Sequence, residues 1–299
     1  MKQILFRGAA TALVTPMQPD GSLDLETLSR LTEWQIQSSI SALVPCGTTG
    51  EAATLTDEER FTVIQTVAKT AAGRVPVIAG AGCNDTARAE QNCLAAAAAG
   101  ADALLLVTPY YNKCTPKGLQ SHFARLASAT PLPVILYNVP SRTGVTIDME
   151  SRRKLSKVDN IIGLKEASTD FSLIHQHLLE LGDTLPLYSG NDDLTLPLMS
   201  LGAHGCISVL ISNLLPHSTE ALCQAILQND LPAARSLHYS LLPLMKSLFC
   251  EVNPIPVKAA MPLVGFPCGS CRMPLSLIEP GHLALLQQQF TMTKQLGLC

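Results

Sequence analysis

The stretch Ile161-Ile162-Gly163-Leu164-Lys165-Glu166 is an apolar run that ends in a lysine. Continuous β-branched runs are typical of strands buried on both faces of a parallel sheet, and alternation predicts Ile161, Gly163 and Lys165 on one face. A buried ammonium without a partner costs roughly 3 kcal/mol or more, so it tends to lose its proton. A neutral lysine is a nucleophile, and Gly163 would leave room for it and a reactant. Alternatively, the ammonium of Lys165 reaches water at the strand end, which this segment alone favours.

Eight strand-like segments occur, most of them at intervals of roughly 30 residues with helical stretches between them. They span residues 8–15, 41–45, 75–80, 103–107, 134–138, 161–166, 187–189 and 205–209. The expected helices include 24–38, where Asp24 can cap the first turn, and 57–72, 86–100, 117–129 and 172–181. This repeat predicts an α/β fold, a (β/α)8 TIM barrel. A doubly wound sheet is the competitor, but Thr15-Pro16-Met17, not a glycine-rich phosphate loop, follows the first strand.

After residue 211 the strand pattern stops, and proline-punctuated helices are expected at about 216–228, 231–249, 254–263 and 281–296. We interpret them as the last barrel helix and a small C-terminal helical appendage. The predicted division is 1–225 for the catalytic barrel and 226–299 for the helical domain.

The 299 residues carry a net charge of -3 and are 47% hydrophobic, which suits a large core and gives no electrostatic case for nucleic acid. Basic residues cluster only at Arg152-Arg153-Lys154, a pattern typical of a solvated helix face.

Residues 1–7 lack the apolar core of a signal peptide and no run is long enough for a membrane span, so no membrane partner and a cytoplasmic location are expected. The ten cysteines are interpreted as reduced thiols, including the pair Cys268 and Cys271.

Polar residues gather where the predicted strands end, which is where barrel enzymes place their sites. Cys46-Gly-Thr-Thr-Gly-Glu51 could offer N–H groups and hydroxyls to a carboxylate, although ordinary turn chemistry also explains it. Tyr110 and Tyr111 end another strand, and interfacial packing is a strong alternative for at least one of them. Tyr137 is expected one strand from Lys165, and Arg142 follows it.

Together, Lys165, Tyr137, Thr48 and Arg142 describe a site for an oxo-acid. The amine suits a carbonyl, the hydroxyls suit proton transfer, and the guanidinium suits a carboxylate. The presence of these three residues near Lys165 favours a catalytic lysine over a solvated one. No His-Glu-x-x-His pattern or nucleophile elbow is present, and neither a metal nor a cofactor is expected.

At these residues the chain resembles the pyruvate-dependent, lysine Schiff-base aldolases of the N-acetylneuraminate lyase superfamily, over nearly its whole length. The shared motifs are Gly47-Thr-Thr-Gly-Glu51, Thr108-Pro-Tyr-Tyr111, Tyr137-Asn-Val-Pro-Ser-Arg-Thr-Gly144, Gly163-Leu-Lys-Glu166, Ser189-Gly-Asn-Asp192 and Asn253-Pro-Ile-Pro-Val-Lys258. Arg142 resembles the arginine of the branch that condenses pyruvate with L-aspartate 4-semialdehyde to 4-hydroxy-tetrahydrodipicolinate, which opens diaminopimelate and lysine biosynthesis.

The resemblance implies a role for each site residue. Lys165 forms the imine with pyruvate, Tyr137 relays protons, and Thr48 links Tyr137 to Tyr111, which the neighbouring subunit of a tight dimer contributes. The pyruvate carboxylate meets Thr48 and the backbone of Thr49, Arg142 binds the carboxylate of the semialdehyde, and carbonyl groups of Gly190 and Ile207 help to position the groups. A homotetramer, a dimer of dimers, is the implied assembly.

Lysine-inhibited members of the family carry a pocket at the dimer interface, and the resemblance places it at Ala52, Asp57, Arg60, Asn84, Arg88 and Tyr110. Arg88 occupies the position where sensitive enzymes have a glutamate, and Asp57 and Arg60 replace histidines. A cation repels a diamino ligand, so weak or absent inhibition by lysine is expected.

Cys46, beside the Gly-Thr-Thr-Gly loop, is either a reactive thiol or a buried inert one.

Two alternatives to this activity are retained. One is another pyruvate aldolase, similar to N-acetylneuraminate lyase or a sugar-acid aldolase, against which Arg142 and the Tyr110-Tyr111 pair argue. The other is a barrel that binds oxo-acids without catalysis.

Overall fold

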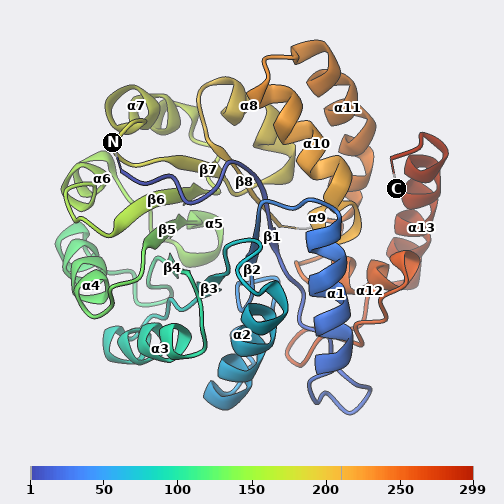
Figure 1. Ribbon diagram of the computed structural model, residues 1–299, viewed down its shortest axis with the longest axis horizontal. Helices are drawn as coiled ribbons and strands as arrows, with labels where there is room; N and C mark the ends of the chain where they lie inside the picture. The colour runs from blue at the N-terminus through green and yellow to red at the C-terminus, as the bar shows by residue number, and fades with distance from the viewer. Residues whose placement is uncertain (1, 210, 299) are drawn as a thin grey trace.

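Eight parallel strands form the centre of the computed structural model, which describes residues 2–209 and 211–298 (Figure 1). The strands are β1 (Gly8–Ala12), β2 (Ala42–Val44), β3 (Ile78–Gly80), β4 (Ala103–Val107), β5 (Val134–Asn138), β6 (Ile161–Glu166), β7 (Leu187–Ser189) and β8 (Gly205–Ser208). Neighbours follow the order β2-β1-β8-β7-β6-β5-β4-β3, and a parallel bridge between Leu43 and Val77 joins the two ends. The sheet curls into a barrel, which confirms the (β/α)8 prediction and excludes the doubly wound sheet.

Helices surround the barrel, because each strand leads through a loop into a helix that covers the sheet (Figure 1). They are α1 (Leu25–Gln37), α2 (Asp57–Ala71), α3 (Thr86–Ala98), α4 (Pro116–Ser128), α6 (Met149–Leu155), α7 (Phe171–Leu181), α8 (Thr195–Ser200) and α10 (Pro216–Leu227). The shorter α5 (Pro140–Thr143), η1 (Asp192–Leu194) and α9 (Ile211–Leu214) lie in loops after strands. Side-chain caps fix several helix starts: Asp24 accepts from the N–H of Thr27, as predicted for α1, and Thr56 forms a capping box with Glu59.

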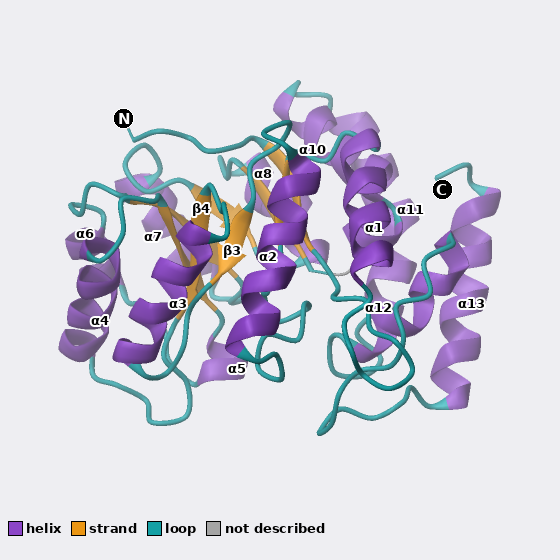
Figure 2. Ribbon diagram, turned by 60° about the horizontal axis from the view of Figure 1, so that its bottom comes forward, coloured by secondary structure: helices purple, strands orange, loops and turns teal. Residues whose placement is uncertain are grey.

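The appendage consists of α11 (Leu231–Ser247), α12 (Ile255–Ala260), η2 (Met261–Val264) and α13 (Pro280–Gln295). It lies at one side of the barrel, beside α1 and α10 (Figures 1 and 2). The ring of Trp34 on α1 contacts the ring of Phe266 at 5.1 Å between centroids. The predicted boundary after residue 225 falls in the last turn of α10.

Two hydrophobic clusters divide the core. One fills the space between the sheet and the helices, and the other fills the barrel interior. At the bottom of the interior, Phe6 stacks on Tyr188 with ring centroids 4.4 Å apart, and its carbonyl accepts a hydrogen bond from the tyrosine hydroxyl. The barrel is therefore closed at this end and open at the carboxyl ends of the strands, where the loops can form a site.

The prediction that Ile161 shares a face with Lys165 is wrong. Ile161 lies in the outer cluster, whereas Ile162 lies in the interior cluster. The pairing of β5 with β6 slips at this point, from Val134 opposite Ile161 to Ile135 opposite Gly163. This bulge inserts one residue and reverses the alternation, after which Gly163 and Lys165 face the interior as expected.

None of the helices in the described residues has the length and apolarity that crossing a membrane requires.

Candidate active site

The end of β6 places Lys165 inside the barrel, and its side chain is only 3% exposed. Nζ lies 4.4 Å from the centroid of the Tyr137 ring, because β5 and β6 pair with these two residues in register. Burial lowers the pKa of Lys165 to about 8, against the opposing charge of Asp192. The ammonium does not reach bulk water at the strand end, so the solvated alternative is wrong and a neutral amine is accessible near neutral pH.

Gly163 does not leave the predicted room beside Lys165 but allows close packing with the neighbouring strand. A Cβ on it would lie 3.2 Å from a ring carbon of Tyr188 and 3.3 Å from the carbonyl of Pro186. The absence of a side chain at Gly163 therefore allows β7 and the residue before it to pack closely against β6.

A buried ion pair supports β6 from the outer side. Arg152 on α6 and Glu166 are both inaccessible to solvent and contact each other at 2.5 Å, so the prediction of a solvated basic cluster is wrong for Arg152. Glu166 also accepts hydrogen bonds from the amide of Asn138 and the N–H of Ser168, each at 2.8 Å. Because Asn138 ends β5, these contacts tie the two strand ends that carry Tyr137 and Lys165.

Tyr137 lies almost wholly buried at the end of β5. Burial raises the pKa of its phenol, and the Arg142 charge and the Thr48 hydroxyl oppose this rise. The phenol therefore keeps its proton at neutral pH and can pass it on to a neighbouring group.

The loop after β2 supplies Thr48 and Thr49. The Thr49 hydroxyl donates to the carbonyl of Val209 at 3.4 Å and accepts from the amide of Asn253 at 3.1 Å. Arg142 lies in α5, after β5, and donates to the backbone carbonyl of Asn253 at 3.3 Å. The structure thus brings together residues that follow two different strands, as predicted, around a residue of the appendage.

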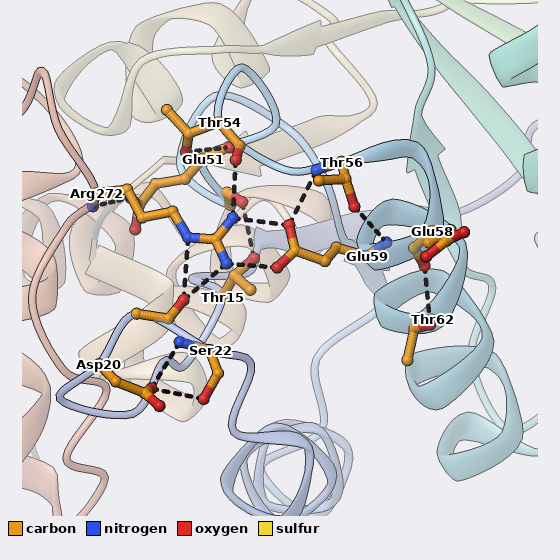
Figure 3. A network of polar contacts seen from close by, with 12 residues as sticks. Thr15, Asp20, Ser22, Glu51, Thr54, Thr56, Glu58, Glu59, Thr62 and Arg272 are labelled. Atoms are coloured by element: carbon orange, nitrogen blue, oxygen red, sulfur yellow. Dashed lines mark hydrogen bonds and ion pairs between the residues drawn. The ribbon is translucent and has the colours of Figure 1, made fainter.

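The same loop is fastened at Glu51, whose side chain is buried. One carboxylate oxygen accepts from Lys258 at 2.6 Å and the other from the N–H of Arg272 at 2.8 Å. In Figure 3 the guanidinium of Arg272 faces the carboxylate of Glu59 and the carbonyl of Thr54. The ion pair with Arg272 lowers the pKa of Glu59 to about 2, so this link persists over the whole neutral range.

Two cavities open at this end of the barrel, one of about 650 Å³ and one of about 490 Å³. Both are lined by Tyr137, Arg142, Val252 and Asn253, and Lys165 lies against the ring of Tyr137. Thr48 lines the larger cavity, and Gly190 lines the smaller one.

Gly190 follows β7 and Ile207 lies on the neighbouring strand β8, one residue beyond the pair that Ser189 forms with Cys206. The N–H of Gly190 donates to the carbonyl of Glu166 at 2.7 Å, and a Cβ on it would lie 2.8 Å from that of Ala167. No residue larger than glycine fits against the end of β6 here. Ile207 belongs to the interior cluster on β8.

The two adjacent tyrosines point to different surroundings. Tyr110 lines the larger cavity and is partly covered, whereas Tyr111 is 90% exposed and has a positive φ of 75°. The structure of the single chain therefore does not bring Tyr111 to Tyr137.

Five of the six residues of the predicted lysine pocket line the larger cavity, and the sixth contacts one of them. Ala52, Arg60, Asn84, Arg88 and Tyr110 line it, and Asp57 pairs with Arg88 at 3.2 Å. Arg60 donates to the carbonyl of Ala52 at 3.0 Å, which holds its charge in the wall of the cavity.

Cys46 is buried and its Sγ lies 3.8 Å from the carbonyl of Arg60. Burial raises the pKa of its thiol to about 12. Of the two alternatives for this residue, the structure supports the inert thiol. Cys268 and Cys271 are free thiols with pKa values raised by burial to about 12.

Sequence reasoning gave no role to Asn138, Arg152, Asp192 or Asn253. Asp192 accepts from the N–H groups of Val209 and Ile211 and counters the effect of burial on Lys165. Asn138, Asp192 and Asn253 stand inside motifs that the sequence displays, which was the available signal, whereas Arg152 had none. Within the described residues, no three His, Cys, Asp or Glu side chains gather in a way that could hold a metal ion.

The chain matches the model of the dihydrodipicolinate synthetase family over residues 5–291. A 4-hydroxy-tetrahydrodipicolinate synthase of Exiguobacterium sibiricum is 49% identical over 284 residues, covering 95% of this chain and 97% of the relative. That of Thermoanaerobacter sp. is 45% identical and covers 95% of each chain. Among solved structures, the dihydrodipicolinate synthase of Acinetobacter baumannii in complex with pyruvate superposes with a TM-score of 0.94 at 39% identity, covering 98% of this chain and 99% of that one. The enzyme of Aquifex aeolicus gives 0.92 at 40%, with the same coverage.

Proposed function

The chain belongs to the dihydrodipicolinate synthetase family, and we propose from this premise how its residues carry out the reaction. The activity is that of a lyase, the condensation of pyruvate with L-aspartate 4-semialdehyde to 4-hydroxy-tetrahydrodipicolinate in diaminopimelate and lysine biosynthesis. The observation that carries the mechanism is the buried amine of Lys165, with its lowered pKa, against the ring of Tyr137.

In the proposed mechanism, the neutral amine of Lys165 attacks the keto carbon of pyruvate, and uptake of one proton with loss of water gives a protonated imine. The imine withdraws electrons, so a methyl proton of pyruvate leaves and an enamine forms. The enamine carbon then attacks the aldehyde carbon of the second substrate, whose oxygen takes up a proton, and the imine forms again. The amino group of that substrate displaces Lys165 from the imine carbon, which closes the ring and frees the lysine. Tyr137 moves protons in these steps, because its phenol lies beside the amine and keeps its proton at neutral pH.

Binding is assigned to the residues around these two. Thr48 and the backbone of Thr49 take the carboxylate of pyruvate, and backbone carbonyls of Gly190 and Ile207 position the reacting groups. Arg142 takes the carboxylate of the semialdehyde, for which its guanidinium at the shared wall of the two cavities is suited.

The assembly is proposed to be a homotetramer in which Tyr111 crosses the tight dimer and reaches Thr48 of the other subunit. Its 90% exposure and left-handed backbone support this, since an exposed tyrosine held in such a conformation suits a partner surface.

We also propose residues 1–225 as the catalytic barrel and 226–299 as the helical domain. A cytoplasmic location is proposed because the described cysteines are free thiols.

The other pyruvate aldolases and a non-catalytic barrel are not favoured, because the relatives that cover nearly the whole chain carry the synthase name. Borohydride reduction in the presence of pyruvate tests the mechanism. A permanent pyruvate adduct on Lys165, found by mass spectrometry and absent from Lys165→Ala, is expected. Release of condensation product on adding L-aspartate 4-semialdehyde is expected next, whereas cleavage of a sugar acid instead would identify an aldolase.

Arg142→Ala separates the two substrates. It should leave the adduct with pyruvate intact and raise KM for the semialdehyde by about 10- to 100-fold, as expected for loss of a charge-assisted hydrogen bond. Loss of the adduct in this variant would mean that Arg142 serves pyruvate.

A further inference from the structure

A segment of the appendage reaches the active site at Asn253. This residue lies between α11 and α12, is 3% exposed, and lines both cavities. It is separated by more than 100 positions from each of the site residues that it contacts.

The side chain and the main chain of Asn253 hold different residues. Its amide Nδ2 donates to Thr49 Oγ1 at 3.1 Å, and Thr49 in turn donates to the carbonyl of Val209, so both directions of the threonine hydroxyl are occupied. The backbone carbonyl of Asn253 accepts from Arg142 at 3.3 Å. The residue thus joins the loop that serves pyruvate to the arginine that serves the second substrate.

The amide of Asn253 is incompletely satisfied. Its Oδ1 is buried and has no hydrogen-bond partner in the described part of the chain. A buried acceptor without a partner costs free energy, so packing stability alone does not explain an asparagine at this place. The contact that its Nδ2 makes with Thr49 does.

Lys258 secures the other end of the same loop. Its amine contacts Glu51 at 2.6 Å and the carbonyl of Ser270 at 3.0 Å, and both charged side chains are about 1% exposed. Arg272, whose N–H also contacts Glu51, extends this anchor to Glu59 (Figure 3). The appendage therefore holds the loop at two points, at Glu51 through Lys258 and at Thr49 through Asn253.

We propose that Asn253 is a positioning residue that sets the place of Thr49, and through its backbone the place of Arg142, so that the two substrate carboxylates bind at a fixed separation. The inference rests on the proposed function, because it takes Thr49 and Arg142 as the two carboxylate sites. It separates the two roles by atom: the side chain serves the pyruvate site, and the carbonyl serves the arginine.

The test compares Asn253→Ala and Asn253→Asp with Ser247→Ala as the matched control. Ser247 is a buried appendage residue whose hydroxyl bonds only within α11, to the carbonyl of Leu244, in the described residues. Three quantities are measured: the pyruvate concentration that gives half-maximal borohydride adduct, KM for the semialdehyde, and the thermal unfolding midpoint.

Both Asn253 variants should raise the half-saturating pyruvate concentration by about tenfold, the size of one lost hydrogen bond. KM for the semialdehyde should change by less than about threefold, because the backbone carbonyl that holds Arg142 remains. Ser247→Ala should lower the unfolding midpoint without changing either concentration. The aspartate keeps the size of the side chain, but when ionised it cannot donate to Thr49 as the amide does and it adds a negative charge to the cavity wall, so its effect should be at least that of alanine.

Pyruvate half-saturation within twofold of wild type in both variants would overturn the proposal. So would equal losses for both substrates that Ser247→Ala reproduces, since these indicate general destabilisation. If the wild-type chain itself forms no pyruvate adduct, the proposed function fails, which is a distinct result.

Discussion

The amine of Lys165 lies 4.4 Å from the centre of the Tyr137 ring, across one pair of neighbouring strands. The register of β5 and β6 fixes this relationship, and the ion pair of Arg152 with Glu166 secures the same strands from outside. The ring packs against the lysine, whereas the hydroxyl carries the proton chemistry. These two contributions of Tyr137 can therefore be separated.

Tyr137→Phe should slow formation of the pyruvate imine by about 10²- to 10⁴-fold, the usual contribution of a positioned proton-transfer group. The ring remains, so the unfolding midpoint should stay close to that of wild type. Rapid-mixing experiments with borohydride trapping measure the rate, and prolonged incubation should still give an adduct on Lys165. An unchanged rate would remove Tyr137 from proton transfer.

The rate of imine formation should depend on pH through the neutral amine of Lys165. With its pKa at about 8, the neutral fraction rises roughly tenfold per pH unit below that value and levels above it. Burial raises the pKa of Tyr137, so its ionisation leaves this window undisturbed. Trapping rates measured from pH 6 to 10 should show the plateau, and a rise that continues to about 10.5 would indicate an ordinary lysine.

Lys165→Met should stabilise the protein at neutral pH. The folded state lowers the pKa of Lys165 from 10.5 to about 8, so between these values the unfolded chain binds the proton more readily and stability rises with pH. The full penalty, about 3 kcal/mol, applies below pH 8 and vanishes above 10.5.

Urea unfolding of the wild type and Lys165→Met from pH 6 to 10.5 measures this difference. Lys154→Met is the control, because the exposed pair of Lys154 with Glu150 should contribute less than about 1 kcal/mol at any pH. Equal stabilities of wild type and Lys165→Met at pH 7 would contradict the lowered pKa.

The barrel and much of the site followed from local patterns. Strands β4, β5, β6 and β7 have the predicted bounds, since apolar runs bounded by turn residues carry strong local information. Lys165, Tyr137, Thr48 and Arg142 were predicted to lie close together because barrel strands place their ends at one rim, and the structure places Tyr137 beside Lys165 and in the wall of a cavity with Thr48 and Arg142. What failed depends on distant partners. The slip at Ile162 arises from pairing with β5, and the burial of Arg152 depends on Glu166 in another element. The contact of Asn253 with Thr49 spans 204 positions and leaves no local trace.

Inhibition by lysine should be weak or absent in the wild type. Arg60 and Arg88 line the larger cavity, and their charges repel a diamino ligand, an effect that salt weakens. Arg88→Glu should increase the inhibition, because it places a second carboxylate beside Asp57. Initial rates with lysine up to 10 mM, roughly the range in which weak Coulombic binding is measurable, decide between these outcomes. Strong inhibition of the wild type below 1 mM, about the limit for a weak site, would contradict the prediction.

A mixture of two inactive variants tests whether Tyr111 serves the neighbouring subunit. Lys165→Ala lacks the nucleophile, and Tyr111→Phe lacks the hydroxyl that is proposed to reach Thr48 of the partner. In a mixed dimer, the subunit with Tyr111→Phe keeps its own Lys165 and receives the intact Tyr111 of the other chain. Dissociation and joint reassembly should therefore restore roughly a quarter of wild-type activity, because random pairing makes half of the dimers mixed, each with one complete site. Separately reassembled variants provide the baseline, and no gain on mixing would place Tyr111 outside the shared site.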